Sequence, residues 1–335
     1  MAILDVRNLS VNYLTDQGIA LRAVEDVSFS LEQGRSLGLV GESGCGKTTA
    51  MLGVLRLLPA EGRIVSGEVR YRPRSETGPS VDLLRLSERE MREYRWSKIA
   101  IVFQGAMNAL NPVRKVGDQI AEPIMLHGAA TSKKEANEQV GELLELVGIT
   151  PEMARQYPHQ YSGGMRQRAM IAMALACSPG ILIADEPTTA LDVMIQAQIL
   201  NLLQNLQQEL ELSIILVTHD LGVVAELCDD VLVMYGGKTA EYASVDTIYN
   251  EPLHPYTQRL LRAFPDVDNP ASDLASIPGY PPPLDALPPG CRFEPRCHCK
   301  SDICAVESPP LVAVKPGHYV ACHLGHLETR RFVDS

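Results

Sequence analysis

The strongest constraint on the fold is a glycine-rich octapeptide, GESGCGKT, at residues 41–48. It follows the apolar run RSLGLV at 35–40 and precedes a helical pattern, which is the context that the motif G-x-x-x-x-G-K-[ST] requires. Glycines let backbone N–H groups curl around phosphate oxygens, and the amino terminus of the following helix adds partial positive charge. The alternative is an ordinary glycine-rich turn. The motif in this context favours a site for nucleotide phosphates.

Two further apolar runs predict strands, GILIA at 180–184 and SIILVT at 213–218, and each leads into polar residues and then a helical pattern. Short apolar strands that alternate with helices indicate a parallel α/β sheet. Apolar residues recur with a helical period in 135–148 and in 193–211, so we expect amphipathic helices there.

The composition excludes some classes of protein. A hydrophobic content of 45% and a charged content of 21% are ordinary for a chain that buries a core. The net charge of −11 argues against a nucleic-acid binder. No run reaches the roughly 18 apolar residues of a membrane helix, and the amino terminus lacks the features of a signal peptide. We therefore expect a cytoplasmic protein with reduced thiols.

Polar residues that follow the predicted strands suggest catalysis. Lys47 would reach the β- and γ-phosphates, and the Thr48 hydroxyl would ligate magnesium. Asp185 is suited to hold the same ion, while Glu186 is placed to orient and deprotonate a water; the alternative is a solvated acidic strand end. His219 ends the third apolar strand and could contact the γ-phosphate. Ligands of open α/β sheets bind beyond the carboxyl ends of the strands, where these residues fall.

The segment YSGGMRQR at 161–168 resembles the LSGGQ signature of ABC-transporter ATPases. The resemblance covers roughly residues 1–250 and includes other family motifs in the usual order. Tyr13 matches the aromatic that stacks on adenine, Gln104 matches the Q-loop glutamine, and ALD at 190–192 matches the D-loop. His219 corresponds to the switch histidine.

The signature also has a physical interpretation. A serine and two glycines before a helix make a second anion-binding helix amino terminus. The chain holds one P-loop, so a second phosphate must come from elsewhere. The resemblance implies that two such subunits face each other head to tail, so that the signature of one closes over the ATP of the other. Tyr161 replaces the usual leucine and Met165 the usual glutamine, both outside the SGG contact.

The motifs and the resemblance together predict an ATP site with magnesium. The predicted catalytic residues are Glu186, His219, Gln104 and Lys47, and magnesium is expected on Thr48, Gln104 and Asp185. The residues expected to contact ATP in the same chain are Tyr13, Gly41, Glu42, Ser43, Gly44, Cys45, Gly46, Lys47, Thr48, Thr49 and Gln104. The residues expected to reach the partner's ATP are Ser162, Gly163, Gly164 and Asp192.

The end of the chain narrows the resemblance to one branch of the family. The segments EPLHPYTQRLLRAFP at 251–265, CRFEPRC and PGHYVACHL resemble the carboxyl-terminal extension of oligopeptide/dipeptide importer ATPases. The segment QGAMNALNP at 104–112 resembles that family too, although Gly105 departs from its common aspartate. The resemblance implies an ATPase that powers import from the cytoplasmic face of the membrane. Expected partners are two permease subunits, a second ATPase that is often related but distinct, and an extracytoplasmic binding protein.

Several alternatives stay open at this point. Relatives in the importer family carry nickel, glutathione or oligosaccharides, and the ATPase sequence does not choose among these substrates. A soluble ABC ATPase of DNA repair or of ribosomes is less favoured, because such proteins carry two cassettes or a long coiled-coil insertion. An exporter ATPase would not be expected to carry this extension. A module that only binds nucleotide is disfavoured by the retained Glu186 and His219.

Five of the eight cysteines lie between residues 291 and 322. Their spacing matches neither paired zinc knuckles nor the compact ferredoxin run. Spacing alone favours a metal site, with zinc and iron–sulfur both open, since His298, His318 and His323 lie near. The resemblance implies a 4Fe–4S cluster with Cys299 as a spare thiol. The ligands would be Cys291, Cys297, Cys304 and Cys322.

The expected fold is an α/β P-loop NTPase with a RecA-like parallel sheet core, an antiparallel β subdomain and an α-helical subdomain. We place the nucleotide-binding domain at 1–250, with the helical subdomain at about 111–165. A small cysteine-rich extension would span 251–335, with a proline-rich connector at 265–290 and the cysteines at 291–322.

Overall fold

The computed structural model describes residues 1–335 except 74–79, 106–108, 190, 264–276 and 325–335. Its contacts divide the chain into two compact units that interleave in sequence. Unit 1 comprises Met1–Ile3, Glu32–Ser36 and Tyr71–Leu216, and unit 2 comprises Leu4–Leu31, Leu37–Arg70 and Val217–Ser335. The predicted domain boundary near residue 250 therefore stays a prediction, since unit 2 holds both the P-loop and the extension.

Among the described residues, unit 1 has four strands, and the last two confirm the apolar runs predicted at 180–184 and 213–218. They are β5 (Val81–Asp82), β6 (Ile99–Val102), β7 (Ile181–Asp185) and β8 (Ser213–Thr218), of which the last two residues belong to unit 2. Strands β6 and β7 run parallel, with Val102 opposite Ala184. Every residue of β7 and β8 is buried, as expected for a parallel sheet that is covered on both faces.

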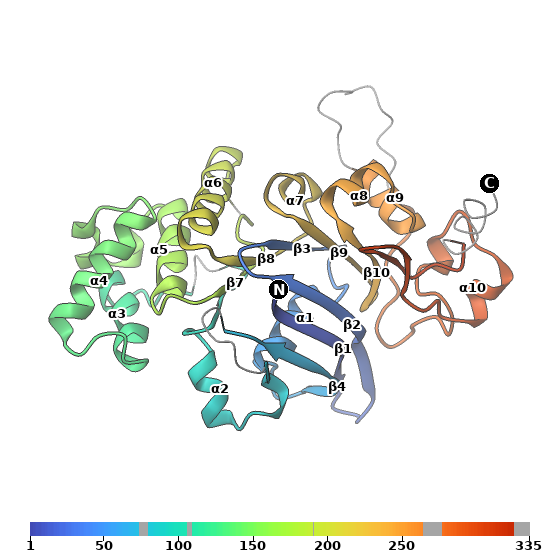
Figure 1. The fold of residues 1–335 in the computed structure, drawn as a ribbon, viewed down its shortest axis with the longest axis horizontal. Coiled ribbons are helices and arrows are strands. Elements are labelled where there is room, and N and C mark those ends of the chain that lie inside the picture. The colour runs from blue at the N-terminus through green and yellow to red at the C-terminus, as the bar shows by residue number, and fades with distance from the viewer. Residues whose placement is uncertain (74–79, 106–108, 190, 264–276, 325–335) are drawn as a thin grey trace. The chain divides into compact units, whose positions relative to one another are not determined.

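Helices fill much of unit 1 (Figure 1). In the stretch predicted to be helical, 111–165, α3 and α4 pack against each other and against α5. Helix α4 begins after Ser132, whose hydroxyl accepts a hydrogen bond from the Glu135 amide, and it buries Val140 and Leu144. The helices are α2 (Glu88–Tyr94), α3 (Val116–Leu126), α4 (Lys133–Leu146), α5 (Gly163–Leu175) and α6 (Val193–Leu210), with short 3-10 turns η1 (Leu83–Arg85), η3 (Pro151–Arg155) and η4 (Pro158–Gln160).

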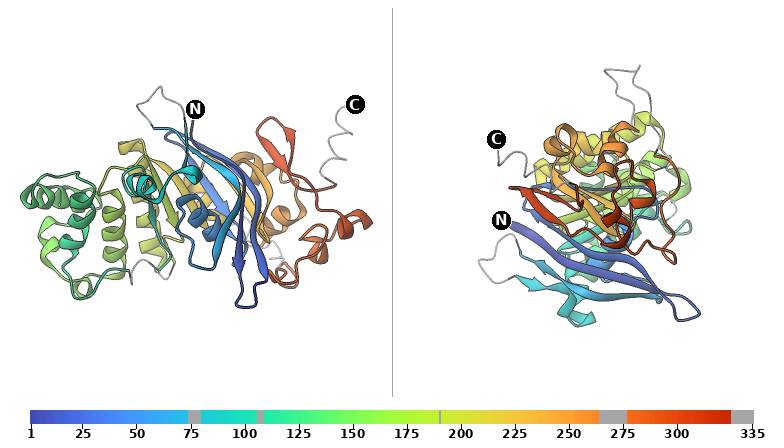
Figure 2. Two further views of the ribbon diagram at one scale, coloured as in Figure 1. Left: turned by 90° about the horizontal axis from the view of Figure 1, so that it is seen from below. Right: turned by 90° about the vertical axis from the view of Figure 1, so that its right-hand side faces the viewer.

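Unit 2 holds two groups of strands (Figure 2). Strands β1 (Ala2–Leu14), β2 (Ala20–Glu32) and β4 (Gly62–Tyr71) neighbour one another in the order β2-β1-β4, and only their end residues Ala2, Ile3, Glu32 and Tyr71 belong to unit 1. The second group has the order β11-β12-β10-β9-β3, in which only β3 and β9 run parallel. Its members are β3 (Ser36–Val40), β9 (Asp230–Tyr235), β10 (Lys238–Ser244), β11 (Val312–Lys315) and β12 (His318–Val320). The parallel sheet expected from the sequence is thus extended by antiparallel strands, two of them from the cysteine-rich tail.

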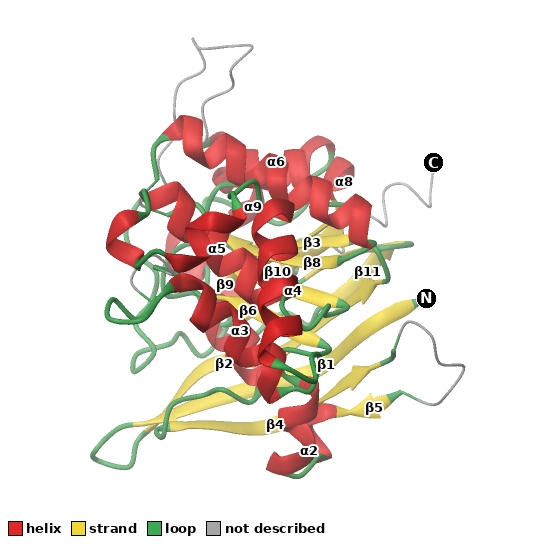
Figure 3. Cartoon of the chain, turned by 90° about the vertical axis from the view of Figure 1, so that its left-hand side faces the viewer, coloured by secondary structure: helices red, strands yellow, loops and turns green. Residues whose placement is uncertain are grey.

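Helices of unit 2 pack on its strands: α8 contacts β9 and β10, and α9 contacts β10 (Figure 3). Helix α7 packs closely on β3, because a Cβ at Gly38 would lie 2.6 Å from Val224 Cγ1. Among the residues that the structure describes, no helix is long and apolar enough to cross a bilayer. The helices are α1 (Lys47–Leu55), α7 (Leu221–Leu227), α8 (Val245–Asn250), α9 (Pro255–Arg262) and α10 (Asp302–Val306), with the 3-10 turn η5 (Glu294–Arg296).

A buried carboxylate joins the tail to the rest of unit 2. Glu241 in β10 is fully buried. It accepts hydrogen bonds from the amides of Leu253 and His254, at 2.8 and 3.0 Å, and its Oε1 lies 2.7 Å from Nε2 of His318 in β12. Burial of a carboxylate is costly unless it is hydrogen-bonded. These three partners therefore fix α9 and β12 against β10.

Candidate functional site

The P-loop of unit 2 has the backbone of a phosphate cradle. Gly41 and Gly46 have φ angles of 148° and 101°, in the region that side chains disfavour. A Cβ at Gly41 would lie 2.2 Å from the Met234 carbonyl oxygen, and one at Gly46 would lie 2.6 Å from that of Ala23. Only glycine fits at both positions. Helix α1 starts at Lys47, so the amides of its first turn lie at the end of the loop.

Lys47 lies inside this loop. Its side chain is 7% exposed, and Nζ donates to the carbonyls of Gly41 at 2.6 Å and Glu42 at 3.2 Å. The cation is thus held among the backbone groups that would surround a phosphate. Cys45 is buried next to it, and burial raises the pKa of the Cys45 thiol. A buried neutral thiol is unreactive, which favours packing as the role of this side chain.

Tyr13 and His219 also belong to unit 2. The Tyr13 hydroxyl shares a hydrogen bond of 3.3 Å with Thr49 Oγ1, so its half-buried side chain lies beside α1. His219 follows β8 directly and is exposed. The next residue, Asp220, caps α7 by accepting from the Val223 amide at 3.3 Å. The turn after β8 is thereby fixed at the point where the histidine leaves the strand.

Unit 1 carries the predicted acidic pair, Asp185 and Glu186, and the Q-loop glutamine, Gln104, at the carboxyl ends of its strands. The register pairs Val102 of β6 with Ala184 of β7, so Gln104, two residues after β6, and Asp185, the last residue of β7, lie at the same ends of the two strands. Asp185 is 1% exposed, whereas Glu186 is partly exposed. Glu186 has a φ of 49°, unusual for a residue with a side chain, and such strain is concentrated at functional sites. Its Oε2 accepts a hydrogen bond of 2.9 Å from Thr189 Oγ1.

The signature and the D-loop meet within unit 1. Ser162 caps α5, accepting from the Met165 amide at 3.2 Å, and Asp192 caps α6, accepting from the Ile195 amide at 2.9 Å. A Cβ at Gly164 would lie 2.8 Å from Ile195 Cγ2. The starts of α5 and α6, which carry the residues predicted to reach a partner's ATP, therefore touch at Gly164. Ala190 of the D-loop and residues 106–108 after Gln104 lie outside the described residues.

The unusual tyrosine of the signature has a local explanation. Tyr161 is 3% exposed, and its hydroxyl donates a hydrogen bond of 2.8 Å to the Met153 carbonyl of η3. Burial raises the pKa of Tyr161 to about 12, so the donor stays protonated at physiological pH. This hydroxyl ties the start of the signature to the turn that precedes it.

The cysteines of the tail lie close together around one cavity. Among the residues described, the five cysteines of the tail line one small cavity, together with Phe293 and His323. Burial, reinforced by the neighbouring thiols, raises the pKa of Cys291 to about 11. None of the described cysteines forms a disulfide. In the same part of the chain, no group of three or more His, Cys, Asp or Glu side chains is placed to hold a metal ion.

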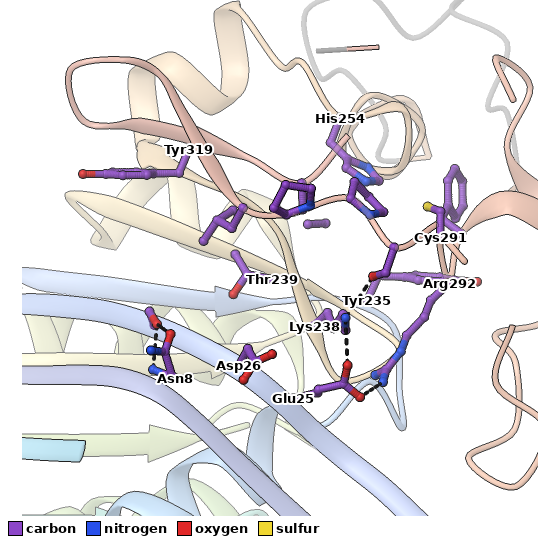
Figure 4. Close-up of a pocket in the computed structure, with 18 residues that line it drawn as sticks. Asn8, Glu25, Asp26, Tyr235, Lys238, Thr239, His254, Cys291, Arg292 and Tyr319 are labelled. Atoms are coloured by element: carbon purple, nitrogen blue, oxygen red, sulfur yellow. Dashed lines mark hydrogen bonds and ion pairs between the residues drawn. The ribbon is translucent and has the colours of Figure 1, made fainter. Parts of the chain in front are cut away.

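Sequence reasoning missed two arginines of the tail. Arg296 makes a bidentate ion pair with Glu42 of the P-loop, with nitrogen–oxygen distances of 2.6 and 3.0 Å. Arg292 pairs with Glu25 at 2.6 Å, and Lys238 pairs with the same carboxylate at 2.8 Å (Figure 4). These last three residues line a cavity of about 580 Å³ within unit 2. The partners lie more than 200 residues apart in sequence, so no local pattern could have found them.

Comparison with known proteins decides the family. The sequence model of the ABC transporter family matches residues 24–189, and that of the oligopeptide/dipeptide transporter carboxyl-terminal region matches residues 240–304. The chain is 48% identical to a probable peptide ABC transporter ATP-binding protein of Sinorhizobium fredii, over 96% of this chain and 94% of the relative. This chain belongs to the ATP-binding subunits of oligopeptide/dipeptide ABC transporters.

Other members of this ABC transporter family are similar over nearly their whole length. The chain is 46% identical to an oligopeptide transport ATP-binding protein of Salmonella typhimurium, over 96% of this chain and 93% of the relative. It is also 46% identical to a dipeptide transport ATP-binding protein of Bacillus subtilis, over 96% and 94%.

Solved ABC cassettes share the fold. A dimeric ATP-binding cassette in a post-hydrolysis state, bound to ADP and phosphate, matches 72% of this chain and 98% of its own length, with a TM-score of 0.62 and 27% identity. An ABC transporter subunit of Clostridium perfringens matches 75% of this chain and 91% of its own length, with a TM-score of 0.61 and 28% identity. The expected P-loop fold is thus confirmed.

Proposed function

We propose that this chain is the ATP-hydrolysing subunit of an importer that carries dipeptides or oligopeptides. The observation that carries the substrate class is the joint match to the ABC cassette and to the oligopeptide/dipeptide carboxyl-terminal region. The P-loop supports the ATPase part, because Lys47 and the amino terminus of α1 lie together in a glycine-rich loop of the kind that binds phosphates.

In the proposed reaction, water attacks the γ-phosphorus of ATP, and the bond between that phosphorus and the bridging oxygen of ADP breaks. Glu186 accepts the proton of the attacking water, and His219 and Gln104 contact the γ-phosphate. Lys47 neutralises charge on the β- and γ-phosphates. Thr48, Gln104 and Asp185 would hold magnesium, which neutralises negative charge on the phosphates when it is bound.

We infer that the working unit contains two ATPase chains. Ser162, Gly163 and Gly164 form a helix amino terminus that suits an anion, and Asp192 lies at the adjacent helix start. These groups would close over ATP held by the other ATPase, which is a related chain or a second copy. The remaining proposed partners are two permease subunits, which hold the complex at the cytoplasmic face of the membrane, and an extracytoplasmic binding protein.

We further propose that Cys291, Cys297, Cys304 and Cys322 hold an iron–sulfur cluster, whereas Cys299 is spare. All five thiols line one cavity, which supports a shared ligand. Zinc held by the same thiols is the alternative. The metal content of the purified protein distinguishes the two.

The substitution Glu186→Gln tests the ATPase mechanism. An amide cannot accept the proton, so we expect hydrolysis to fall by about two orders of magnitude or more, while ATP stays bound. Glu211→Gln is a matched control, because Glu211 is an exposed glutamate with the same φ of 49° and no predicted role. ATP turnover and retained radiolabelled ATP measure the result. Unchanged turnover in Glu186→Gln would refute Glu186 as the base.

A further inference from the structure

Buried side chains of the carboxyl-terminal extension form hydrogen bonds with the P-loop. Arg296, at the end of η5, is 8% exposed, and its guanidinium makes two parallel bonds to the carboxylate of Glu42, the second residue of the P-loop. Paired charged hydrogen bonds of this kind fix direction as well as distance. The ion pair therefore sets where the Glu42 side chain points.

Further bonds hold Arg296 itself. Its Nε donates to the Pro278 carbonyl at 2.9 Å, and Nη1 donates to the Tyr235 hydroxyl at 3.2 Å. The guanidinium carbon lies 5.7 Å from the centre of the Tyr235 ring, within cation–π range. The arginine is thus held by the tail on one side and by β9 on the other, so its position is independent of Glu42.

A second contact reaches the backbone of the same P-loop residue. The amide of Glu42 donates a hydrogen bond of 2.9 Å to the hydroxyl of Tyr256, in the first turn of α9. Tyr256 is fully buried, with its ring 4.7 Å from that of Tyr235 and 5.3 Å from that of Phe293. Both the side chain and the amide of Glu42 are therefore fixed by residues outside the P-loop.

Glu42 in turn contacts the lysine of the motif. The Glu42 carbonyl accepts from Lys47 Nζ at 3.2 Å, so one residue joins the extension to the cation that would face the phosphates. The other end of the loop is held in a similar way. Arg292 donates to the Gly236 carbonyl, and the next residue, Gly237, donates its amide to the Cys45 carbonyl at 2.9 Å.

We propose that Arg296 and Tyr256 are positioning residues for nucleotide binding: they act through Glu42 to hold the P-loop in the shape that accepts phosphates. The inference rests on the proposed ATP site. It assigns to the extension a part in forming that site, because the carboxylate and the amide of Glu42 are both held by residues outside the loop. Phosphate binding needs several amides and Lys47 in one arrangement, so release of Glu42 weakens binding before it changes the chemical step.

The test uses the full-length chain and measures the Kd for MgATP by titration calorimetry. Arg296→Met should raise the Kd about tenfold, and Tyr256→Phe, which keeps the ring but removes the hydroxyl, about fivefold. Arg296→Lys keeps the positive charge but cannot make the bidentate pair of a guanidinium, so its Kd should lie between those of Arg296→Met and the wild type. Lys300→Met is the matched control, because Lys300 lies in the same segment and pairs with Glu294 instead; its Kd should stay within about twofold of wild type.

A positioning role predicts two further results. The KM for ATP hydrolysis should rise in Arg296→Met while kcat changes little. The effect of Arg296→Met on Kd should also shrink when Glu42→Gln is already present, because both changes break one contact. Additive effects in the double variant would overturn the proposal, and so would a lowered melting temperature with an unchanged Kd. If Arg296→Met does not fold, Tyr256→Phe decides, and a wild-type Kd there overturns the proposal.

Lys47→Ala separates this inference from the proposed function. If Lys47→Ala abolishes MgATP binding and Arg296→Met does not affect it, the positioning role is wrong and the ATP site stands. If Lys47→Ala binds MgATP as tightly as wild type, the ATP site itself is wrong, and the positioning role falls with it.

Discussion

At the scale of single residues, charged groups of unit 2 depend on partners that are far away in sequence. Glu25 lies between Lys238 and Arg292, with distances of 2.8 and 2.6 Å (Figure 4). Burial alone would raise the pKa of the Glu25 carboxyl, but the hydrogen bond from Lys238 and the charge of Arg292 outweigh it, so the pKa is lowered. The ionised form is therefore favoured in the folded protein.

This lowered pKa predicts a pH dependence of stability. The unfolded chain takes up the Glu25 proton first as the pH falls, so the stabilisation is complete above about pH 4.5 and is lost as the pH falls through the lower folded pKa. We expect Glu25→Gln to lower the unfolding free energy at pH 7, and the difference from wild type to shrink below pH 4.5. Urea unfolding at several pH values measures this. A difference that does not vary with pH would contradict the prediction.

At the scale of elements, two helix starts explain the second glycine of the signature. Helices α5 and α6 begin next to each other, and Gly164 faces Ile195 where the two starts touch. The capping serine and aspartate satisfy amides at these starts, so the same groups serve helix stability and the proposed anion site.

A methyl group at this contact tests the arrangement. Gly164→Ala would place its Cβ 2.8 Å from Ile195 Cγ2, so we expect a loss of about 1–3 kcal/mol of unfolding free energy. Gly141→Ala is the matched control: that glycine also lies in a helix, but its nearest neighbour for an added Cβ is Pro151 at 3.6 Å. The control should be neutral or more stable by up to about 1 kcal/mol. Thermal unfolding of both variants measures these changes. A Gly164→Ala variant as stable as wild type would contradict the close packing of Gly164 against Ile195.

At the scale of the whole molecule, the tail is built into the unit that carries the P-loop. Strand β12 pairs with β10, Glu241 joins both to α9, and Arg292 and Arg296 contact the residues around the phosphate cradle. The extension is thus a structural part of unit 2, and its cysteines lie on the same segment as these arginines.

The proposed cluster predicts a bound metal in the intact protein. Anaerobically purified protein should be brown, absorb near 400 nm and contain about four iron atoms per chain. Cys304→Ser should lose both iron and absorbance, because Cys304 is buried in the shared cavity. Cys299→Ser, at the exposed thiol, should keep them. One zinc per chain with no iron would show that the proposal is wrong.

The sequence by itself determined the local features of this protein. Its P-loop and its apolar runs at 35–40, 180–184 and 213–218 follow from glycine spacing and short-range periodicity, and strands lie there. The resemblance to peptide-importer ATPases rested on such local motifs, and the comparisons confirm it. The proposed roles of Glu186, His219 and Gln104 stay predictions.

Only the tertiary structure decided which distant groups meet. The tail strands β11 and β12 were missed because they are only four and three residues long, and β12 is stabilised by pairing with β10. The partners of Glu42 were missed because Arg296 lies 254 residues away in the chain. The sequence around an arginine does not identify the carboxylate with which it pairs. An ion pair depends on distance in space and on burial, and only the folded chain sets these.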